Sequence, residues 1–406
     1  MLLNRSRPGW GSYLNRRRYV LLLVIVLAFL LSQSFLSSNI RPISQADIKP
    51  EFLWHSSYRD SPDVDYETRV RDALKYIEQV AVEHGDNGAT NKIWQILLGT
   101  GENTDNRGPH SHDFQEKNAD WDFQVVLSKW ANWFIESNLN LVPDLEYWWK
   151  SYPDEVLRAD LLRYLLLWYH GGYYADLDII PALPIRDCPS LQHPAVQQNP
   201  KSPISLIIGV ESDEPFATRE MGKQWQGSRK YGFIQYTMYA PRRFSPVLRE
   251  VIVRVLSHTK QHFDRQKWLF GEFYDHYDER TTHEITGPGV FTDTILDMLS
   301  ETLPESHPLI VQSAEAERKY TDSLPKRVTW APFHRIQEPV CVDASESAPG
   351  KEMGGLCVLP VSTWGNGQRH SGSVPFNSPN ACINHLFSGS WKKGHRRTPY
   401  LSQIFN

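Results

Sequence analysis

The chain has 406 residues, of which 40% are apolar and 12% aromatic, so it can bury a sizeable core in one large or two medium domains. Its net charge of -4 and pI of about 6.4 offer no general attraction to nucleic acid. Basic residues gather only at 16–18 and 392–397, which excludes nucleic acid as the main partner.

The N-terminal part carries the pattern of a membrane anchor. Residues 19–36 form a mostly apolar stretch of 18 residues that follows five arginines, and no Lys or Arg comes after it before Arg41. As a helix this stretch would span about 27 Å, enough for a thin bilayer, and the charge asymmetry would keep residues 1–18 in the cytosol. We therefore expect a type II signal anchor with the rest of the chain in the lumen. A signal peptide cleaved near residues 32–34 is the alternative.

The four cysteines would then lie in an oxidising compartment. They are Cys188, Cys341, Cys357 and Cys382, and four thiols allow three pairings. Cys341 and Cys357 sit in strand-like runs joined by a Gly/Ser-rich turn, so we expect them to pair. The spacing fits no zinc pattern.

The first lumenal residues have the composition of a stem. Residues 37–63 are polar and contain Pro and Ser, whereas apolar residues recur at helical spacing over 65–84 until Gly85. We interpret 37–90 as a stem with a lead-in helix, and this helix could equally be the first layer of the domain. An apolar strand at 92–99 then opens an α/β core.

Strands and helices alternate through the rest of the chain. This order predicts a mostly parallel sheet with helices on both faces. The expected strands are 121–127, 205–211 and 233–240, and the expected helices are 128–137, 245–258 and one that follows the Gly287-Pro288-Gly289 break and runs to 299.

A central helix is predicted over 154–169. Gly171 and Gly172 end it, since glycine readily adopts the left-handed conformation of a helix terminus. The helix is apolar nearly all round, and Asp160 and Arg163 are exceptions that share one face. Buried charges must be paired or used, so these two form either a structural salt bridge or part of a site.

An acidic strand is expected to follow the glycine pair. Alternation places Tyr174, Asp176 and Asp178 on one face of it. Two neighbouring carboxylates repel one another, and a divalent metal is the simplest neutraliser. The alternative is a strand end at which both acids meet solvent. Because α/β folds bind ligands at strand termini, the position favours a site.

These motifs, in this order, resemble the sugar-binding Asp-x-Asp region of glycosyltransferase family 32, and within it the fungal initiation-type alpha-1,6-mannosyltransferases of the Golgi. The resemblance covers about residues 90–392. It rests on Arg158-Ala159-Asp160, Arg163-Tyr164, Gly171-Gly172, Tyr174, Asp176 and Asp178, together with the segments 92–95, 286–293 and 385–392.

The resemblance implies a GT-A type, Rossmann-like nucleotide-sugar-binding domain at 91–395, followed by a C-terminal tail at 396–406. It also implies a divalent metal, usually manganese, which suits carboxylate and imidazole ligands. The implied metal and catalytic residues are Asp176 and Asp178, with His385 as a further metal ligand. The implied donor-binding residues are Asp160, Arg163, Tyr174, Trp94, Ser390 and Trp391.

The activity that the resemblance implies is a retaining alpha-1,6-mannosyl transfer from GDP-mannose to a glycan acceptor. This transfer would serve N-glycan outer-chain or mannan synthesis at the Golgi membrane. A Golgi mannosyltransferase complex is the protein partner that the resemblance suggests. The alternatives are transfer of galactose or N-acetylglucosamine, sphingolipid mannosylation, or a non-catalytic subunit of a mannan polymerase. A glycoside hydrolase fits less well, because its two carboxylates must flank the scissile bond.

Two segments depart from the family pattern. Residues 97–101 replace the usual Thr-Trp-Lys after the opening strand, which leaves base recognition open. Residues 365–373 form a loosened Gly-rich loop, so the acceptor can differ from that of the initiating enzymes. Asp293 is a candidate acceptor contact, although its position is also that of an ordinary residue early in a helix.

Overall fold

The computed structural model describes residues 56–83, 91–99, 103–197, 204–218, 221, 229–270, 277–318 and 326–387. The expected cytosolic tail and signal anchor, most of the stem, and the C-terminal tail 396–406 lie outside these residues. No helix among the described residues combines the length and the apolar character that a bilayer span requires.

A mixed sheet lies at the centre of the fold, in the order β2-β1-β3-β7-β5-β9-β8, with β6 beside β5. β1 runs parallel to both β2 and β3, and β5 runs parallel to β9. The expected α/β class is confirmed, but β7 runs antiparallel to both of its neighbours. The strands are β1 Lys92–Leu97, β2 Asp122–Leu127, β3 Gly172–Ala175, β5 Leu206–Asp213, β6 Tyr231–Phe233, β7 Thr237–Ala240, β8 Val340–Val342 and β9 Leu356–Leu359.

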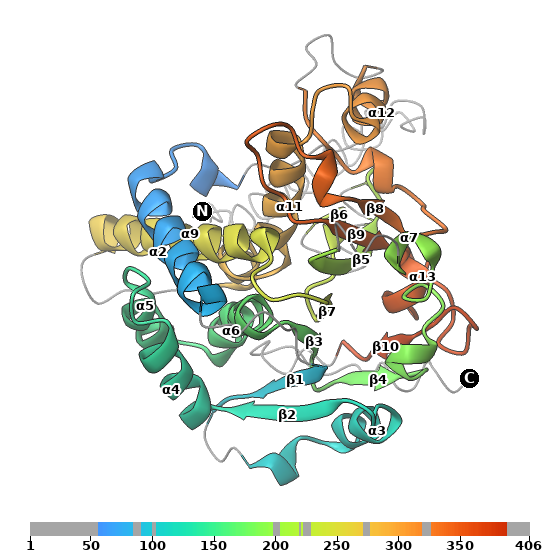
Figure 1. Ribbon diagram of the computed structural model, residues 1–406, viewed down its shortest axis with the longest axis horizontal. Helices are drawn as coiled ribbons and strands as arrows, with labels where there is room; N and C mark the ends of the chain where they lie inside the picture. The colour runs from blue at the N-terminus through green and yellow to red at the C-terminus, as the bar shows by residue number, and fades with distance from the viewer. Residues whose placement is uncertain are drawn as a thin grey trace, which may run out of the picture. The chain divides into compact units, whose positions relative to one another are not determined.

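Helices cover both faces of this sheet, as predicted (Figure 1). Among the described residues, the larger apolar core is covered by seven helices, and α10 Glu279–Ile285 contacts two of them, α9 and α11. The seven are α2 Val64–Glu83, α4 Ser128–Asn138, α5 Leu145–Ser151, α6 Glu155–His170, α9 Pro246–Phe270, α11 Pro288–Thr302 and α12 Pro308–Glu317. The smaller core on the other face includes side chains from α3 Pro109–Lys117 and α13 Val361–Trp364, with α7 Pro194–Gln197 against it.

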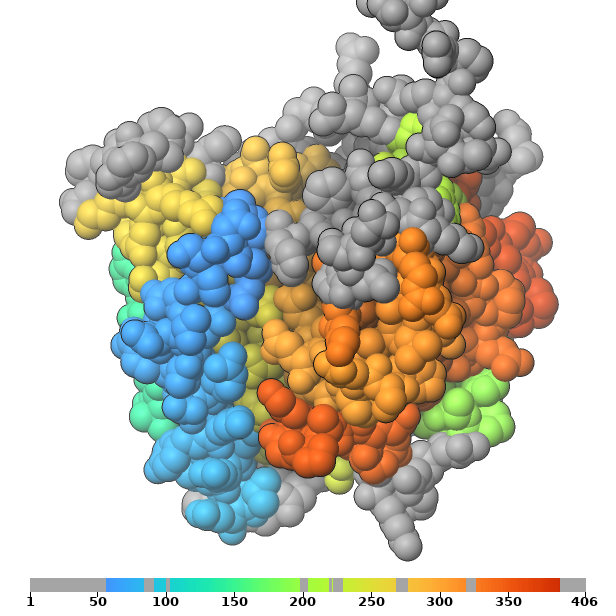
Figure 2. Space-filling model, turned by 90° about the horizontal axis from the view of Figure 1, so that it is seen from above, coloured from blue at the N-terminus to red at the C-terminus, as the bar shows by residue number. Residues whose placement is uncertain are grey.

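The predicted lead-in helix is α2, and it is the first layer of the fold. Its residues Tyr66, Val70 and Leu74 are fully buried in the larger core. Figure 1 shows α2 crossing α9, and Figure 2 shows the surfaces of these two helices side by side. Of the two alternatives for this helix, the domain layer is therefore the correct one.

The predicted central helix is α6. Asp154 is its N-cap residue, and the chain leaves it through Gly171 and Gly172 at φ of 68° and 96°, values that disfavour any side chain. Every residue from Asp160 to Trp168 is buried. The all-round burial expected from the sequence is confirmed.

The prediction of one continuous acidic strand through Asp176 and Asp178 is wrong. β3 ends at Ala175, and Asp176 begins a turn in which its carbonyl accepts the N–H of Ile179 at 3.2 Å. The chain then leaves the main sheet as β4 Ile179–Pro181, which pairs antiparallel with β10 Ile383–His385. Asp176 and Asp178 therefore share a turn and not a strand face.

Two further boundaries differ from the prediction. The expected strand 233–240 is split into β6 and β7, because the chain between them turns to other partners: the N–H of Ile234 donates to Gly209, and the carbonyl of Tyr236 accepts from Asp176. The helix expected over 245–258 continues to Phe270, since no Gly or Pro interrupts it before Gly271.

The structure contains two disulfides, one between adjacent strands and one between segments that lie far apart in the chain. The predicted Cys341–Cys357 bond is confirmed, and it links two directly opposed residues of β8 and β9. The remaining pair, Cys188–Cys382, spans 194 residues. It ties the segment after β4 to the residue that precedes β10.

Candidate active site

The turn after β3 brings together three potential metal ligands. Ligand atoms of Asp176, Asp178 and His385 all lie within 4.8 Å of one another, and His385 Nε2 is 3.0 Å from Asp178 Oδ1. The pairing of β10 with β4 creates this contact, because it sets His385 directly opposite Ile179. Residues 207 positions apart thus meet at one point.

His385 is held in a defined orientation. Its ring packs on Tyr236 and Phe387, with ring centroids 4.0 and 4.2 Å apart, and it is 9% exposed. Burial, the largest single effect, would lower its pKa, but the carboxylates of Asp178, Asp176 and Glu211 together outweigh burial and hold the pKa above its ordinary value. Its Nδ1 is buried without a hydrogen-bond partner among the described residues. The two carboxylates and one imidazole fit a divalent cation of the manganese type.

Asp160 and Arg163 of α6 join this cluster. Arg163 Nη2 lies 3.0 Å from Asp160 Oδ1 and 3.3 Å from Asp176 Oδ1, and its guanidinium lies over the Tyr174 ring. The structural salt bridge and the link to the acidic turn therefore coexist. Burial raises the pKa of Asp160 to about 6, although Arg163 opposes this shift.

Asp160 is also fixed by two neutral hydrogen-bond donors. Its carboxylate accepts hydrogen bonds from Thr286 Oγ1 at 3.0 Å and from Gln235 Nε2 at 3.3 Å. Thr286 opens the predicted Thr-Gly-Pro segment, so this motif contacts the site through its first residue. Asp293 of the same segment is 4% exposed and pairs with Arg229. Its contact with an acceptor stays a prediction.

Glu211, near the end of β5, is a site residue that the sequence reasoning missed. It is half-buried, and its electrostatic neighbours are His385 and Asp176. Burial raises its pKa to about 7. The available signal was an acid directly after the apolar run 206–210, at the carboxyl end of a strand.

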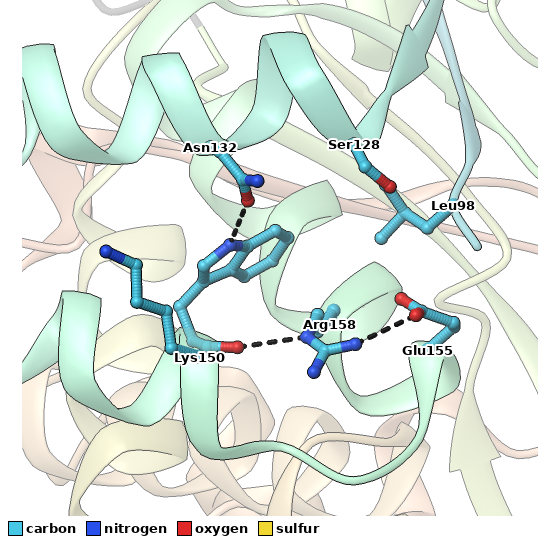
Figure 3. A pocket seen from close by; sticks show the side chains of 7 residues that line it. Leu98, Ser128, Asn132, Lys150, Glu155 and Arg158 are labelled. Atoms are coloured by element: carbon cyan, nitrogen blue, oxygen red, sulfur yellow. Dashed lines mark hydrogen bonds and ion pairs between the residues drawn. The ribbon is translucent and has the colours of Figure 1, made fainter. Parts of the chain in front are cut away.

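A cavity of about 210 Å³ opens at the carboxyl ends of β1 and β2, the same sheet edge as Asp176. It is lined by Leu98, Ser128, Asn132, Trp149, Lys150, Glu155 and Arg158. Figure 3 shows Glu155 and Arg158 of α6 facing one another below Ser128 and Asn132 of α4. Arg158 Nη1 lies 2.9 Å from Glu155 Oε1. The first turn of α6 thus contributes to this cavity, while its second and third turns carry Asp160 and Arg163.

Four further residues are predicted to contact the donor. Trp94 is 2% exposed and donates its indole N–H to the Gly171 carbonyl at 2.9 Å, so its contact with a base stays a prediction. Ser390 and Trp391 lie outside the described residues. Tyr174 is 1% exposed, and its hydroxyl donates to Asp176 Oδ1.

Comparison with known proteins supports the resemblance seen in the sequence. Residues 89–197 match the family model described as "Glycosyltransferase sugar-binding region containing DXD motif". This segment includes α6 and the turn with Asp176 and Asp178.

Three curated relatives carry the name initiation-specific alpha-1,6-mannosyltransferase. The Candida albicans protein is 27% identical over 70% of this chain and 66% of its own length. The Saccharomyces cerevisiae protein is 24% identical over 92% of this chain and 94% of its own length. The Schizosaccharomyces pombe protein is 28% identical over 59% of this chain and 48% of its own length. The chain thus spans just under two thirds of the first relative and about half of the third.

A solved structure, "PaToxG Glycosyltransferase", matches 57% of this chain and 79% of its own, at 17% identity and a TM-score of 0.34. A superposition this loose supports no argument about the site. Residues 89–197 thus match the DXD-containing sugar-binding region of glycosyltransferases, and the chain is similar to the fungal initiation-specific alpha-1,6-mannosyltransferases.

Proposed function

We propose that the protein is a metal-dependent, retaining alpha-1,6-mannosyltransferase that uses GDP-mannose in N-glycan outer-chain or mannan synthesis. The observation that carries this proposal is the convergence of Asp176, Asp178 and His385 at one point beside Asp160 and Arg163. The names of the three relatives support mannose as the transferred sugar. The mixed α/β sheet is consistent with a GT-A type domain.

Asp178 and His385 would hold the metal directly, and Asp176 would complete the site. When bound, a divalent cation such as manganese supplies positive charge that stabilises the leaving nucleoside diphosphate. The protein's own charges require such compensation. Among the described residues, the cation paired with the acidic group Asp160, Asp176, Asp178 and Glu211 is Arg163, because His385 is neutral when it acts as a ligand.

Asp160 and Arg163 would orient the donor hexose. Both side chains are at most 6% exposed and are fixed by Thr286, Gln235 and Asp176. Groups held this rigidly lose little conformational entropy when sugar hydroxyls bind to them. Substrate would therefore meet a preformed set of donors and acceptors at the acidic turn.

The cavity beside α6 would take the nucleotide base. It offers the Glu155 carboxylate as an acceptor, and Asn132 has an amide N–H2 to donate because its Oδ1 already accepts from Trp149. Guanine presents N–H donors as well as the O6 and N7 acceptors, which is the complementary pattern. Guanine can donate two adjacent N–H groups, N1–H and the exocyclic amine, to a carboxylate, whereas uracil can donate only N3–H, and this difference supports GDP over UDP as the nucleotide.

The predicted signal anchor at 19–36 would place the enzyme in the Golgi membrane as a single-pass type II protein. The five preceding arginines and the two disulfides support a lumenal catalytic domain. Membrane sedimentation of the full chain, together with protease protection of the catalytic domain in sealed vesicles, tests this topology. Protease digestion of the domain in intact vesicles would contradict it.

The decisive test is Asp178→Ala, with Asp187→Ala as the control for an exposed aspartate outside the site. Transfer from GDP-mannose, UDP-galactose and UDP-N-acetylglucosamine would be measured with and without manganese. We expect transfer from GDP-mannose alone, its dependence on the metal, and its loss in Asp178→Ala with an unchanged melting temperature. Undiminished transfer by Asp178→Ala would sink the assignment.

One observation favours a second acceptor class. A stretch of 61 residues, 14% of this chain, is 36% identical to "Inositol phosphoceramide mannosyltransferase 2" of Schizosaccharomyces pombe. Offering the enzyme both an oligomannose glycan and inositol phosphoceramide decides between the acceptors. No transfer from any donor to either acceptor would favour a non-catalytic subunit of a mannan polymerase complex, a reading against which the intact acidic turn and His385 argue.

A further inference from the structure

Glu211 occupies an irregular position in the sheet. Val210 pairs with Phe233 and Ser212 pairs with Gly232, so Glu211 is one extra residue on β5 between two pairs that are adjacent on β6. This is a β-bulge, and bulges redirect a side chain and are frequent beside active sites. Regular pairing between β5 and β6 is thus interrupted at Glu211, and the carboxylate of Glu211 neighbours the acidic turn.

The backbone around the bulge is fixed from a second direction. The carbonyl of Glu211 accepts a hydrogen bond from Gln368 Nε2 at 3.3 Å, and Gln368 belongs to the Gly-rich loop 365–373. The bulged residue therefore lies between that loop, where the sequence departs from the family pattern, and the site that contains Asp176 and His385.

The Glu211 carboxylate has no hydrogen bond or ion pair with any described side chain, whereas Asp160, Asp176, Asp178 and Asp293 each have at least one such partner. It is also absent from the group of ligand atoms within 4.8 Å, which consists of Asp176, Asp178 and His385. A half-buried carboxylate without a protein partner is available to a ligand that can donate hydrogen bonds to it.

The chemistry of the site narrows the choice of ligand. A nucleoside diphosphate carries only acceptor oxygens toward a metal, and a carboxylate beside it would be repelled. Sugar hydroxyls are neutral donors, so they satisfy a carboxylate without adding charge to an already acidic site. The group that fits Glu211 is therefore a sugar hydroxyl, either of a hexose or of the nucleotide's ribose, and binding to the ribose would show itself as a loss of GDP affinity.

We propose that Glu211 binds a sugar hydroxyl at the reaction centre and orients that sugar for transfer. This inference rests on the proposed function, because it requires a sugar beside the acidic turn. The hydroxyl has two possible sources with the same chemistry, the hexose of the donor and the hexose of the acceptor glycan. In either case Glu211 touches substrate and leaves the metal and the diphosphate to other residues.

The experiment compares the wild-type enzyme with Glu211→Gln and Glu211→Ala. Glu317→Gln is the matched control, since Glu317 is a 1% exposed carboxylate that pairs with Arg327 away from the site. The measurements are kcat and KM for transfer to an oligomannose glycan, and the affinities for manganese, GDP and GDP-mannose. We expect both Glu211 variants to lose roughly 10- to 100-fold in kcat/KM, as for a hydrogen bond to a charged group, with manganese and GDP affinity unchanged.

The two sources give different signatures. A donor hydroxyl predicts weaker binding of GDP-mannose with unchanged binding of GDP, and an unchanged acceptor KM. An acceptor hydroxyl predicts a raised acceptor KM with unchanged binding of GDP-mannose. Either signature supports the proposal, and unchanged melting temperatures exclude a folding defect.

The proposal is overturned if both Glu211 variants transfer at the wild-type rate, or if manganese and GDP affinity fall in parallel with transfer. If the wild-type protein transfers no hexose at all, the proposed function fails on its own account. Glu211 is then judged by binding alone, and wild-type affinity of Glu211→Gln for both GDP-mannose and the oligomannose glycan overturns its role.

Discussion

If the cavity beside β1 takes the nucleotide base as proposed, Glu155 is the residue whose carboxylate would distinguish one base from another. It is the first residue of α6, lines the cavity beside β1 and is paired with Arg158 at 2.9 Å. That ion pair orients the carboxylate, so an oxygen is available to N–H groups of a bound base. Guanine has an exocyclic amino group to donate, which uracil lacks.

We expect Glu155→Gln to weaken GDP binding by roughly tenfold, because a neutral amide replaces a charged acceptor. UDP binding should fall less, because uracil can donate only one N–H to the carboxylate, and the preference for GDP over UDP should fall accordingly. Titration calorimetry with both nucleotides in the presence of manganese measures this preference.

Glu146→Gln is the control for this prediction. Glu146 is an exposed helix residue that pairs with Lys150, another lining residue of the cavity, so the variant removes a nearby charge without touching Glu155. Equal losses of GDP and UDP affinity in Glu155→Gln would show that the carboxylate supports the cavity and does not read the base.

At the scale of secondary-structure elements, the position of His385 depends on a three-residue strand. β10 is short, and its pairing with β4, the Cys188–Cys382 bond and the hydrogen bond from the N–H of Leu386 to the Asp178 carbonyl hold it against the acidic turn. The carbonyl of Cys382 adds to this anchoring, since it accepts the N–H groups of Ala182 and Leu183 at 3.0 and 3.1 Å. The disulfide thus lies three residues from the proposed third metal ligand.

We expect the double variant Cys188→Ser/Cys382→Ser to bind manganese about tenfold more weakly, as happens when groups that orient a metal ligand are removed. Titration of the variant with manganese, followed by binding or by transfer rate, measures this change. The double variant would change the position of His385, whereas the metal ligands themselves would stay the same.

The Cys341–Cys357 bond provides the comparison. It lies within the main sheet, between β8 and β9, and closes a loop of 16 residues away from β10. Cys341→Ser/Cys357→Ser should lower the melting temperature and leave manganese affinity unchanged. Similar manganese affinities for the two double variants would contradict a specific role of Cys188–Cys382.

Elements with a strong local pattern could be predicted from the sequence. The apolar spacing of α2, the glycine stop of α6 and the opening strand β1 all depend on neighbouring residues, and the structure places them within one or two positions of the prediction. The turn at Asp176 could not be predicted in this way. Its residues alternate as in a strand, and the turn forms because Tyr236 and β10 supply partners from distant parts of the chain.

The same limit applies to Glu211. A bulge is defined by the register of two strands, and the register of β5 and β6 is fixed by packing and not by local sequence. His385, in contrast, was found through the resemblance to a family. The sequence alone would have left it as one histidine among 15.

At the scale of the whole molecule, the stability of the fold toward acid depends on a buried histidine. His258 of α9 is 1% exposed, stacks on Tyr58 and lies with Nδ1 2.8 Å from the carbonyl of Glu284 in α10. Burial lowers its pKa to about 3, and the nearby guanidinium of Arg254 acts in the same direction. The folded protein thus keeps this imidazole neutral.

An unfolded chain takes up a proton on this histidine near its ordinary pKa of about 6.5. Since the folded pKa is depressed, the stabilisation is fully present above pH of about 6.5 and is lost progressively as the pH falls toward the folded value. The contribution of His258 to this loss is roughly 1.4 kcal/mol of unfolding free energy per pH unit below that point.

His258→Gln tests this contribution, because glutamine keeps a polar side chain but does not titrate. Urea unfolding at pH 7, 6, 5 and 4 gives the free energy of unfolding for the wild type and the variant, and the difference between the two isolates His258 from the carboxylates that titrate in the same range. We expect the variant to be the less stable at pH 7 and to lose less stability on acidification. An exposed histidine, replaced in His112→Gln, should leave the slope unchanged, and parallel slopes for the wild type and His258→Gln would refute the prediction.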